Sequence, residues 1–199
     1  MSALPPGQSG PHGRLAAAVV VPVKAFAQAK MRLASVLGPD ERAELARKMA
    51  TRVLAAARPW PVVVVCDDAD VAAWAQSQGA RVLVEPGLGL NGAVQTAFAQ
   101  LGDEGWQRLV VAHGDLPLAT NLGWLADAEG IVLVPDRHDE GTNVISLPTG
   151  CAFAFAYGPG SFARHQQEAQ RTGLAWRVVH DAELAWDVDF PDDMTAVAL

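Results

Sequence analysis

Three aspartates that follow apolar runs of the sequence could bind a divalent cation together. Leu109–Ala112 has the character of a buried strand, after which the chain breaks at Gly114 and presents Asp115. Ligands of open α/β sheets bind outside the carboxyl ends of the strands, so we expect Asp115 to face one. Asp187 and Asp189 are alternate residues of an extended segment and point to the same face. We predict that these three aspartates converge on one cation; the alternative is that the first merely ends a strand and the others are solvated.

The expected cation is Mg²⁺, and basic residues stand where phosphates would meet it. Three carboxylates around Mg²⁺ leave coordination positions open for water and phosphate oxygens. Lys24, Lys30 and Arg32 follow the first apolar run and could orient a triphosphate; the alternative is a solvated basic helix. The chain contains no G-x-x-x-x-G-K-[ST] motif, and no G-x-G-x-x-G follows the first run. A P-loop kinase and a dinucleotide-dependent dehydrogenase are therefore disfavoured.

Two glycine-rich loops could each hold an anion or a base. Gly89 precedes a helix whose expected N-cap is Asn91, so this loop offers free N–H groups to a nucleotide; an ordinary strand-to-helix turn is the alternative. Gly158 and Ser161 precede a second helix, which predicts another anion cradle. His113 could act as a general base, but an acceptor with an ionised phosphate needs little deprotonation, so we expect His113 to be structural.

The elements that must position these residues alternate between short apolar runs and helical patterns. The runs are continuous and rich in β-branched residues, as in strands buried on both faces of a sheet. We expect strands at 16–23, 62–65, 81–84, 109–112, 131–134, 144–147, 151–156 and 176–179. We expect helices at 26–37, from 39 onward, from 68 to 78, after 91, at 121–127, at 162–171 and from 191. This alternation predicts an α/β layered fold with a largely parallel sheet that is mixed between 144 and 156.

Composition limits the class of protein. At 199 residues, half of them hydrophobic, the chain fits one domain with a substantial core, which we place at 15–199 after a flexible tail at 1–14. A formal net charge of −7 disfavours nucleic acid as a partner. Cys66 and Cys151 form no zinc or disulfide pattern, which is compatible with the cytoplasm. No apolar run reaches the roughly 20 residues needed to span a membrane.

Several motifs, taken in order, resemble the guanylyltransferases of deazaflavin coenzyme F(420) biosynthesis. They are Pro22-Val23-Lys24, Ala29-Lys30-x-Arg32-Leu33, Gly89-Leu90-Asn91, His113-Gly114-Asp115-Leu116-Pro117-Leu118, Pro135-Asp136-Arg137-His138, Gly141-Thr142-Asn143, Gly158-Pro159-Gly160-Ser161-Phe162 and Asp187-Val188-Asp189 with Pro191-Asp192-Asp193. The resemblance runs from about Ala16 to the C-terminus. It implies a Rossmann-like nucleotidyltransferase fold of the glycosyltransferase-A type, with a mixed, mostly parallel sheet.

The resemblance also implies an activity and a set of site residues. Members of that family join the GMP part of GTP to a three-carbon phosphorylated acid and release pyrophosphate. The implied mechanism is in-line attack by an acceptor phosphate oxygen on the α-phosphorus. The product is an unstable phosphoanhydride, so we expect hand-over to the next enzyme of the pathway. By resemblance, the same aspartates hold Mg²⁺, and the other candidates are Thr142, Gly158 and Ser161 for the acid, Lys24 and Lys30 for phosphates, and Arg32 for substrate.

Departures from the family pattern leave the acceptor open, among them the acidic pair Asp139-Glu140 before Gly141. Met31 stands where a small polar residue is usual, Trp186 replaces a smaller aliphatic residue, and Phe190 stands where Thr is common. Phosphoenolpyruvate, 2-phospho-L-lactate and 3-phospho-D-glycerate are all candidates, and we favour the first. The alternative functions are transfer to a sugar phosphate or a molybdopterin-type acceptor by another nucleotidyltransferase, and nucleotide binding by a non-catalytic module.

Overall fold

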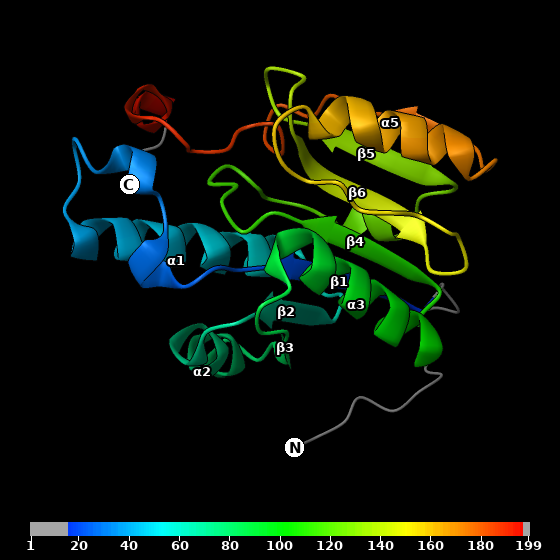
Figure 1. Ribbon diagram of the computed structural model, residues 1–199, viewed down its shortest axis with the longest axis horizontal. Coiled ribbons are helices and arrows are strands. Elements are labelled where there is room, and N and C mark those ends of the chain that lie inside the picture. The colour runs from blue at the N-terminus through cyan, green and yellow to red at the C-terminus, as the bar shows by residue number, and fades with distance from the viewer. Residues whose placement is uncertain (1–15, 197–199) are drawn as a thin grey trace.

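Seven strands form one mixed sheet in the part of the chain that the computed structural model describes, residues 16–196 (Figure 1). The strands are β1 (Ala17–Pro22), β2 (Val62–Cys66), β3 (Arg81–Val84), β4 (Arg108–Ala112), β5 (Ile131–Pro135), β6 (Thr142–Pro148) and β7 (Trp176–Val178). The α-helices are α1 (Pro39–Ala56), α2 (Ala69–Ser77), α3 (Gly89–Asp103), α4 (Gly123–Ala126) and α5 (Ser161–Arg171), and 3₁₀ turns cover Phe26–Gln28, Met31–Leu33 and Pro191–Ala196. The expected tail at residues 1–14 lies outside the described residues.

The strand order places a switch point beside β1. The order is β3-β2-β1-β4-β6-β5-β7, and β6 runs antiparallel to both its neighbours, whereas the other pairs are parallel. The predicted α/β fold with a mixed, mostly parallel sheet is thus confirmed. From β1 the chain builds β2 and β3 on one side and then returns to add β4 on the other. The carboxyl ends of β1 and β4 therefore border the crevice in which such folds bind ligands.

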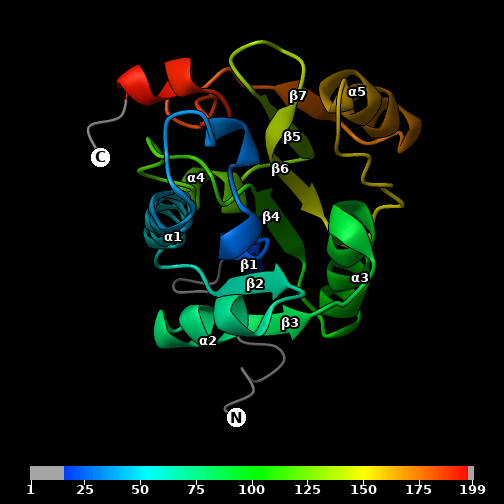
Figure 2. The same ribbon diagram turned by 60° about the vertical axis from the view of Figure 1, so that its left-hand side comes forward.

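Helices cover both faces of the sheet. Figure 2 shows α1 and α4 on one side and α3 and α5 on the other. Alternate residues of β1 face the two layers: Val19 and Val21 belong to the core shared with α1, α2 and α4, whereas Ala18 and Val20 belong to the core shared with α3 and α5. No helix in the described part is long and apolar enough to cross a membrane.

Three expectations about local structure are wrong. The segment expected to be one helix at 26–37 forms two 3₁₀ turns separated by Lys30, whose φ of 52° is left-handed. Helix α3 begins at Gly89 after Leu88, so Asn91 lies inside its first turn and is not the N-cap. Residues 151–156 contain no strand, because side chains of two helices, rather than a neighbouring strand, bind their backbone.

Helix α3 binds one edge of this extended segment, residues 152–157, which we call the strap. The Gln95 amide donates to Phe153 O and accepts from the Phe155 N–H, both at 3.1 Å. One helical turn earlier, the Asn91 amide donates to Tyr157 O at 3.1 Å and accepts from the Tyr157 N–H at 2.6 Å. The two amides thus satisfy backbone groups that would otherwise need a partner strand.

Helix α5 binds the other edge of the strap. Glu168 Oε1 accepts from the Ala154 N–H at 2.7 Å, and His165 Nε2 accepts from the Ala156 N–H at 2.9 Å. In an extended chain the backbone groups of successive residues point to opposite sides, so α3 binds the odd-numbered residues and α5 the even-numbered ones. The strap is therefore held like a central strand, with two ladders of side chains in place of strand neighbours.

A close contact at Gly130 gives a test of the fold away from the cleft. Gly130 has a φ of +63°, and a Cβ atom there would lie 2.1 Å from Ala175 O, the carbonyl that accepts the Ile131 N–H at 2.9 Å. We expect Gly130→Ala to lower the free energy of unfolding by about 3 kcal/mol, because the β5–β7 edge must shift. Gly150→Ala, where a Cβ meets nothing within 4 Å, should change it by less than about 0.5 kcal/mol in the same urea titration. Equal stability of the two variants would contradict the described packing.

Candidate active site

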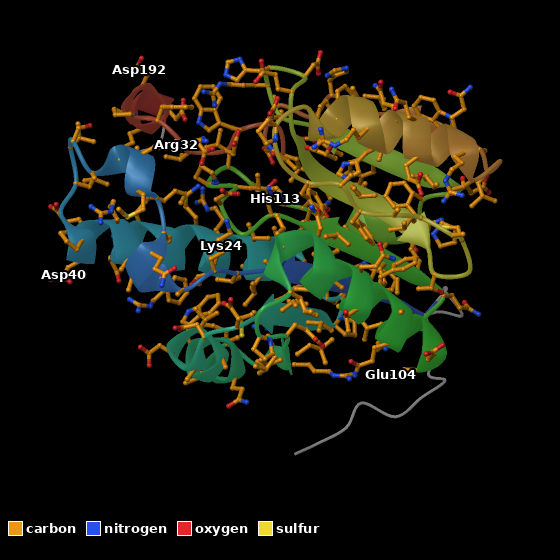
Figure 3. The ribbon with its side chains drawn as sticks, in the orientation of Figure 1. Lys24, Arg32, Asp40, Glu104, His113 and Asp192 are labelled. Atoms are coloured by element: carbon orange, nitrogen blue, oxygen red, sulfur yellow. The ribbon has the colours of Figure 1, made fainter. Side chains whose placement is uncertain are left out.

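A cleft with a volume of about 1080 Å³ opens where β1 and β4 end. Its walls include the segment after β1, the turn after β4, the start of β6, residues 157–161 and the acidic segment 187–189. Because β6 is antiparallel to β4, with Val144 opposite Ala112, the first residues of β6 lie beside the turn that carries Asp115. Figure 3 shows His113, from this turn, near the middle of the molecule, far from Glu104 at the end of α3.

Lys30 links two of the predicted cation ligands. Its Nζ lies 2.5 Å from Asp115 Oδ2 and 3.1 Å from Asp189 Oδ1, and its side chain is only 9% exposed. Burial alone would lower the pKa of Lys30, but attraction to the two carboxylates outweighs it and raises this pKa. Arg32 NH1 lies 2.9 Å from Asp189 Oδ2, but this guanidinium is 62% exposed. The left-handed backbone at Lys30 therefore places a charged ammonium between Asp115 and Asp189.

The three aspartates feel one another's charge but are not equally compensated. Burial would raise the pKa of Asp115, but Lys30 and His113 outweigh it and hold this pKa at about 2. Among the described residues, Asp187 has no basic partner at hydrogen-bond distance, and burial, followed by repulsion from Asp115 and Asp189, raises its pKa to about 6. The cluster therefore carries excess negative charge at neutral pH.

These residues fit a divalent cation, although they do not form a preset cage. Asp115 Oδ1 is buried and has no hydrogen-bond partner in the described part of the chain. Buried polar atoms normally have a partner, so this oxygen is suited to bind a ligand. Within residues 16–196, no three Asp, Glu, His or Cys side chains are grouped closely enough to hold a metal ion as they stand. The convergence of Asp115, Asp187 and Asp189 on one Mg²⁺ ion therefore stays a prediction.

Two residues of the resemblance motifs, to which the sequence analysis gave no role, hold the acidic segment in place. Arg137 NH1 donates to Asp187 O at 3.1 Å, and its guanidinium also pairs with Asp193 and lies over the Trp186 ring. Asp193 Oδ2 in turn accepts from the backbone N–H groups of Asp189 and Phe190, both at 2.7 Å. Neither partner is near the other in sequence, so no local pattern could have indicated this support.

The loop predicted as a second anion cradle lies at the start of α5 and lines the cleft. Gly158 and Gly160 have φ values of 121° and 70°, which side chains rarely adopt. Arg164 fixes two carbonyl groups of this loop, because its guanidinium donates to Gly158 O at 3.3 Å and to Pro159 O at 2.7 Å. Ser161 is buried at the first position of α5 and lines the cleft. The glycine backbone and Arg164 therefore fix the shape of loop 158–161, which ends at the buried Ser161.

Thr142 lines the same cleft. It is the first residue of β6, is 1% exposed and lines the cleft. Its Oγ1 lies 3.0 Å from Nδ1 of His165, which is completely buried. The fold thus brings Thr142 to the same cleft as the loop that contains Gly158 and Ser161.

Of the other candidates, Lys24 and Gly89 line the cleft, whereas Asn91 is not among its lining residues. Lys24 is exposed at the end of β1, Gly89 begins α3, and both border the cleft. The Asn91 amide is engaged by the Tyr157 backbone, so it shapes the loop after the strap as well as the start of α3. The His113 ring packs 4.9 Å from the Tyr157 ring, and burial lowers its pKa. A neutral, packed His113 agrees with the structural role expected for it.

Comparison with known proteins places this geometry in a family. The family described as "Guanylyl transferase CofC like" matches residues 17–199. The chain belongs to the CofC-like guanylyl transferases. Phosphoenolpyruvate guanylyltransferase of Sphaerobacter thermophilus is 39% identical over 188 residues, covering 90% of this chain and 91% of the relative. The enzyme of the same name from Rubrobacter xylanophilus is 38% identical over 184 residues, covering 88% and 90%. The resemblance inferred from the sequence motifs is confirmed.

Solved structures place the CofC-like chain in the nucleotidyltransferase fold. A nucleotide-diphospho-sugar transferase candidate from Desulfovibrio desulfuricans has a TM-score of 0.70 at 20% identity, covering 88% of this chain and 83% of that one. A nucleotidyl transferase from Methanothermobacter has a TM-score of 0.61 at 13% identity, covering 90% and 94%. At these identities the likeness concerns the fold, and it confirms the expected nucleotidyltransferase architecture.

The buried His165 should make this CofC-like protein sensitive to acid. Burial, together with His113 and Arg164, lowers the pKa of His165 to about 4 although Glu168 opposes the shift. The His165 imidazole is therefore protonated below about pH 6.5 in the unfolded chain, but only below about pH 4 in the folded chain. We expect up to about 3 kcal/mol of stability, present above pH 6.5, to be lost as the pH falls to 4.

Urea titrations between pH 7 and pH 4.5 measure this loss. His165→Gln should give a flatter pH dependence, because the group that titrates has been removed. His180→Gln, at an exposed histidine, should follow the wild-type curve. A His165→Gln variant with the wild-type pH dependence would show that other groups cause the acid sensitivity.

Proposed function

We propose that this chain transfers GMP from GTP to phosphoenolpyruvate, with release of pyrophosphate, in the biosynthesis of coenzyme F(420). The observation that carries the proposal is the meeting, in one cleft, of the Lys30 carboxylate cluster and the loop at Gly158–Ser161. The family match supports guanylyl transfer, and the names of the relatives support phosphoenolpyruvate as the acceptor. A reaction between two phosphates needs two such binding groups in one cleft, one for the triphosphate and one for the acceptor.

In this proposal the chain acts by positioning and charge neutralisation. Loop 158–161 and the Thr142 hydroxyl hold the acceptor so that a phosphate oxygen faces the α-phosphorus in line with the leaving pyrophosphate. Lys24 and Lys30 face the triphosphate and offset its charge. The acceptor phosphate is already ionised, so no side chain has to remove a proton, and His113 stays neutral.

Asp115, Asp187 and Asp189 would hold Mg²⁺, which supplies electrostatic stabilisation of the leaving pyrophosphate. The unpartnered Asp115 Oδ1 and the uncompensated charge at Asp187 support this assignment. The product is a phosphoanhydride that water can hydrolyse, so we propose direct hand-over to the enzyme that consumes it.

The test is pyrophosphate release from GTP and Mg²⁺ with phosphoenolpyruvate, 2-phospho-L-lactate and 3-phospho-D-glycerate supplied separately. ATP and CTP in place of GTP are the matched controls. Release with GTP and phosphoenolpyruvate alone supports the proposal as stated. Release with a different acceptor corrects the substrate, and silence with all three, even with the next pathway enzyme added, would reject it.

A further inference from the structure

We infer that His165 is a positioning residue that fixes the Thr142 hydroxyl as a hydrogen-bond donor toward the anionic acceptor. The inference rests on the proposed function, in which Thr142 contacts the acceptor. His165 itself is completely buried and acts only through its neighbours.

The backbone of the strap selects the tautomer of His165. The Ala156 N–H lies 2.9 Å from Nε2, and an amide N–H can only donate, so Nε2 must be the acceptor. A neutral imidazole has one N–H, which is therefore on Nδ1. The low pKa of the buried ring, about 4, keeps it neutral at pH 7.

This tautomer decides what Thr142 can offer. Nδ1–H points at Thr142 Oγ1 over 3.0 Å, so the hydroxyl oxygen accepts from the ring. A hydroxyl has one hydrogen, and with the ring as donor this hydrogen must point elsewhere. Thr142 lines the cleft, so the hydrogen is available to a ligand oxygen there. The pair thus presents a donor to the cleft, which suits an ionised phosphate or carboxylate.

The same ring also fixes the spacing of the acceptor subsite. Ala156, which it binds, stands two residues before Gly158 and five before Ser161. Thr142 belongs to β6, whereas these residues belong to the loop at the start of α5. His165 therefore ties one wall of the subsite to the other in addition to orienting the hydroxyl.

The ¹⁵N chemical shifts of the His165 imidazole show which ring nitrogen carries the proton, and they can be measured on the wild-type protein. In ¹⁵N-labelled protein at pH 7 we expect His165 Nδ1 to be protonated and Nε2 to be unprotonated. A proton on Nε2 would overturn the inference. This readout needs no turnover, so it remains decisive even if the proposed reaction proves wrong.

Kinetics and phosphoenolpyruvate binding test the effect on the acceptor. His165→Phe keeps a buried ring without the Nδ1–H donor, and we expect KM and Kd for phosphoenolpyruvate to rise about ten-fold, with KM for GTP nearly unchanged. Glu168→Gln is the matched control, because Glu168 binds the strap from the same helix without being bonded to Thr142. It should stay near wild type.

A double-mutant cycle distinguishes orientation of Thr142 from general loosening. Thr142→Val removes the hydroxyl and should raise KM for phosphoenolpyruvate to a similar extent, while Thr142→Ser should keep most of the affinity. Adding His165→Phe to Thr142→Val should raise this KM by less than His165→Phe does alone, because only the bond to Ala156 is then still lost. Independent, multiplicative effects would overturn the inference, whereas failure of the wild type to turn over any acceptor would reject only the proposed function.

Discussion

Replacement of Asp187 by asparagine should lower the rate of GTP-dependent pyrophosphate release by about 10³-fold. Asp187 is one of three carboxylates proposed to hold Mg²⁺, and it is the one without a basic partner at hydrogen-bond distance in the described residues. An amide has the same shape but supplies no negative charge to the cation. The measurement is the initial rate at saturating GTP and acceptor over a range of Mg²⁺ concentrations.

Although Asp187→Asn should lower the rate, it should not lower the stability of the protein. A pKa raised to about 6 means that ionised Asp187 destabilises the folded chain at pH 7, by up to about 3 kcal/mol. In buffer with EDTA, the variant should therefore be as stable as the wild type or more stable at pH 7. The difference should fade by pH 4, where the folded wild type is already protonated.

Asp40→Asn provides the control for both measurements. Asp40 is exposed in the first turn of α1 and lies well away from His113 in Figure 3. This substitution should leave the rate unchanged and alter stability by at most about 1 kcal/mol. Near-normal turnover by Asp187→Asn would reject the assignment of three carboxylates to one cation.

Replacement of Lys30 by methionine should damage both folding and activity. Methionine fills similar space but leaves Asp115 and Asp189 without the buried ammonium that now lies 2.5 and 3.1 Å from them. Because both carboxylates are partly exposed, we expect a loss of about 2–3 kcal/mol rather than the full cost of breaking a buried pair. The rate should fall by about 10²-fold, since Lys30 also faces the triphosphate.

Magnesium should rescue part of the stability of Lys30→Met. A cation held by the aspartates would replace the missing positive charge, so Mg²⁺ should raise the Tm of the variant more than that of the wild type. Arg32→Met is the matched control, because Arg32 contacts Asp189 from an exposed position. It should lose less than about 0.5 kcal/mol. Equal destabilisation by the two substitutions would show that Lys30 does not compensate a buried charge.

The sequence could predict features that depend on local pattern. Apolar runs located the strands, and the rule that ligands meet the carboxyl ends of strands placed Asp115 in the cleft. Lys24 and Lys30 were found in the same way, from their position after β1. The glycine pattern before α5 indicated Gly158 and Ser161, and the family resemblance added Thr142 and assigned all three residues to the acid.

The features that were missed depend on pairs that are distant in sequence. Arg137 and Asp193 are 56 residues apart, and His165 and Thr142 are 23 residues apart. The local sequence around each residue does not indicate which partner it contacts. Residues 151–156 misled for a different reason. Their continuous apolar run correctly predicted an extended chain, but an apolar run cannot show whether a neighbouring strand or helix side chains supply the hydrogen bonds.

The two-sided attachment of the strap has a consequence for how the protein can vary. A strand paired with another backbone can slip by two residues and regain its hydrogen bonds, because every backbone offers the same groups. The strap cannot, since its partners are individual amide, imidazole and carboxylate groups at fixed places on α3 and α5. Insertion of one residue would turn every odd position toward α5 and every even position toward α3. We therefore expect residues 152–157 to tolerate neither insertion nor deletion, even at Ala152 and Ala154, which are exposed.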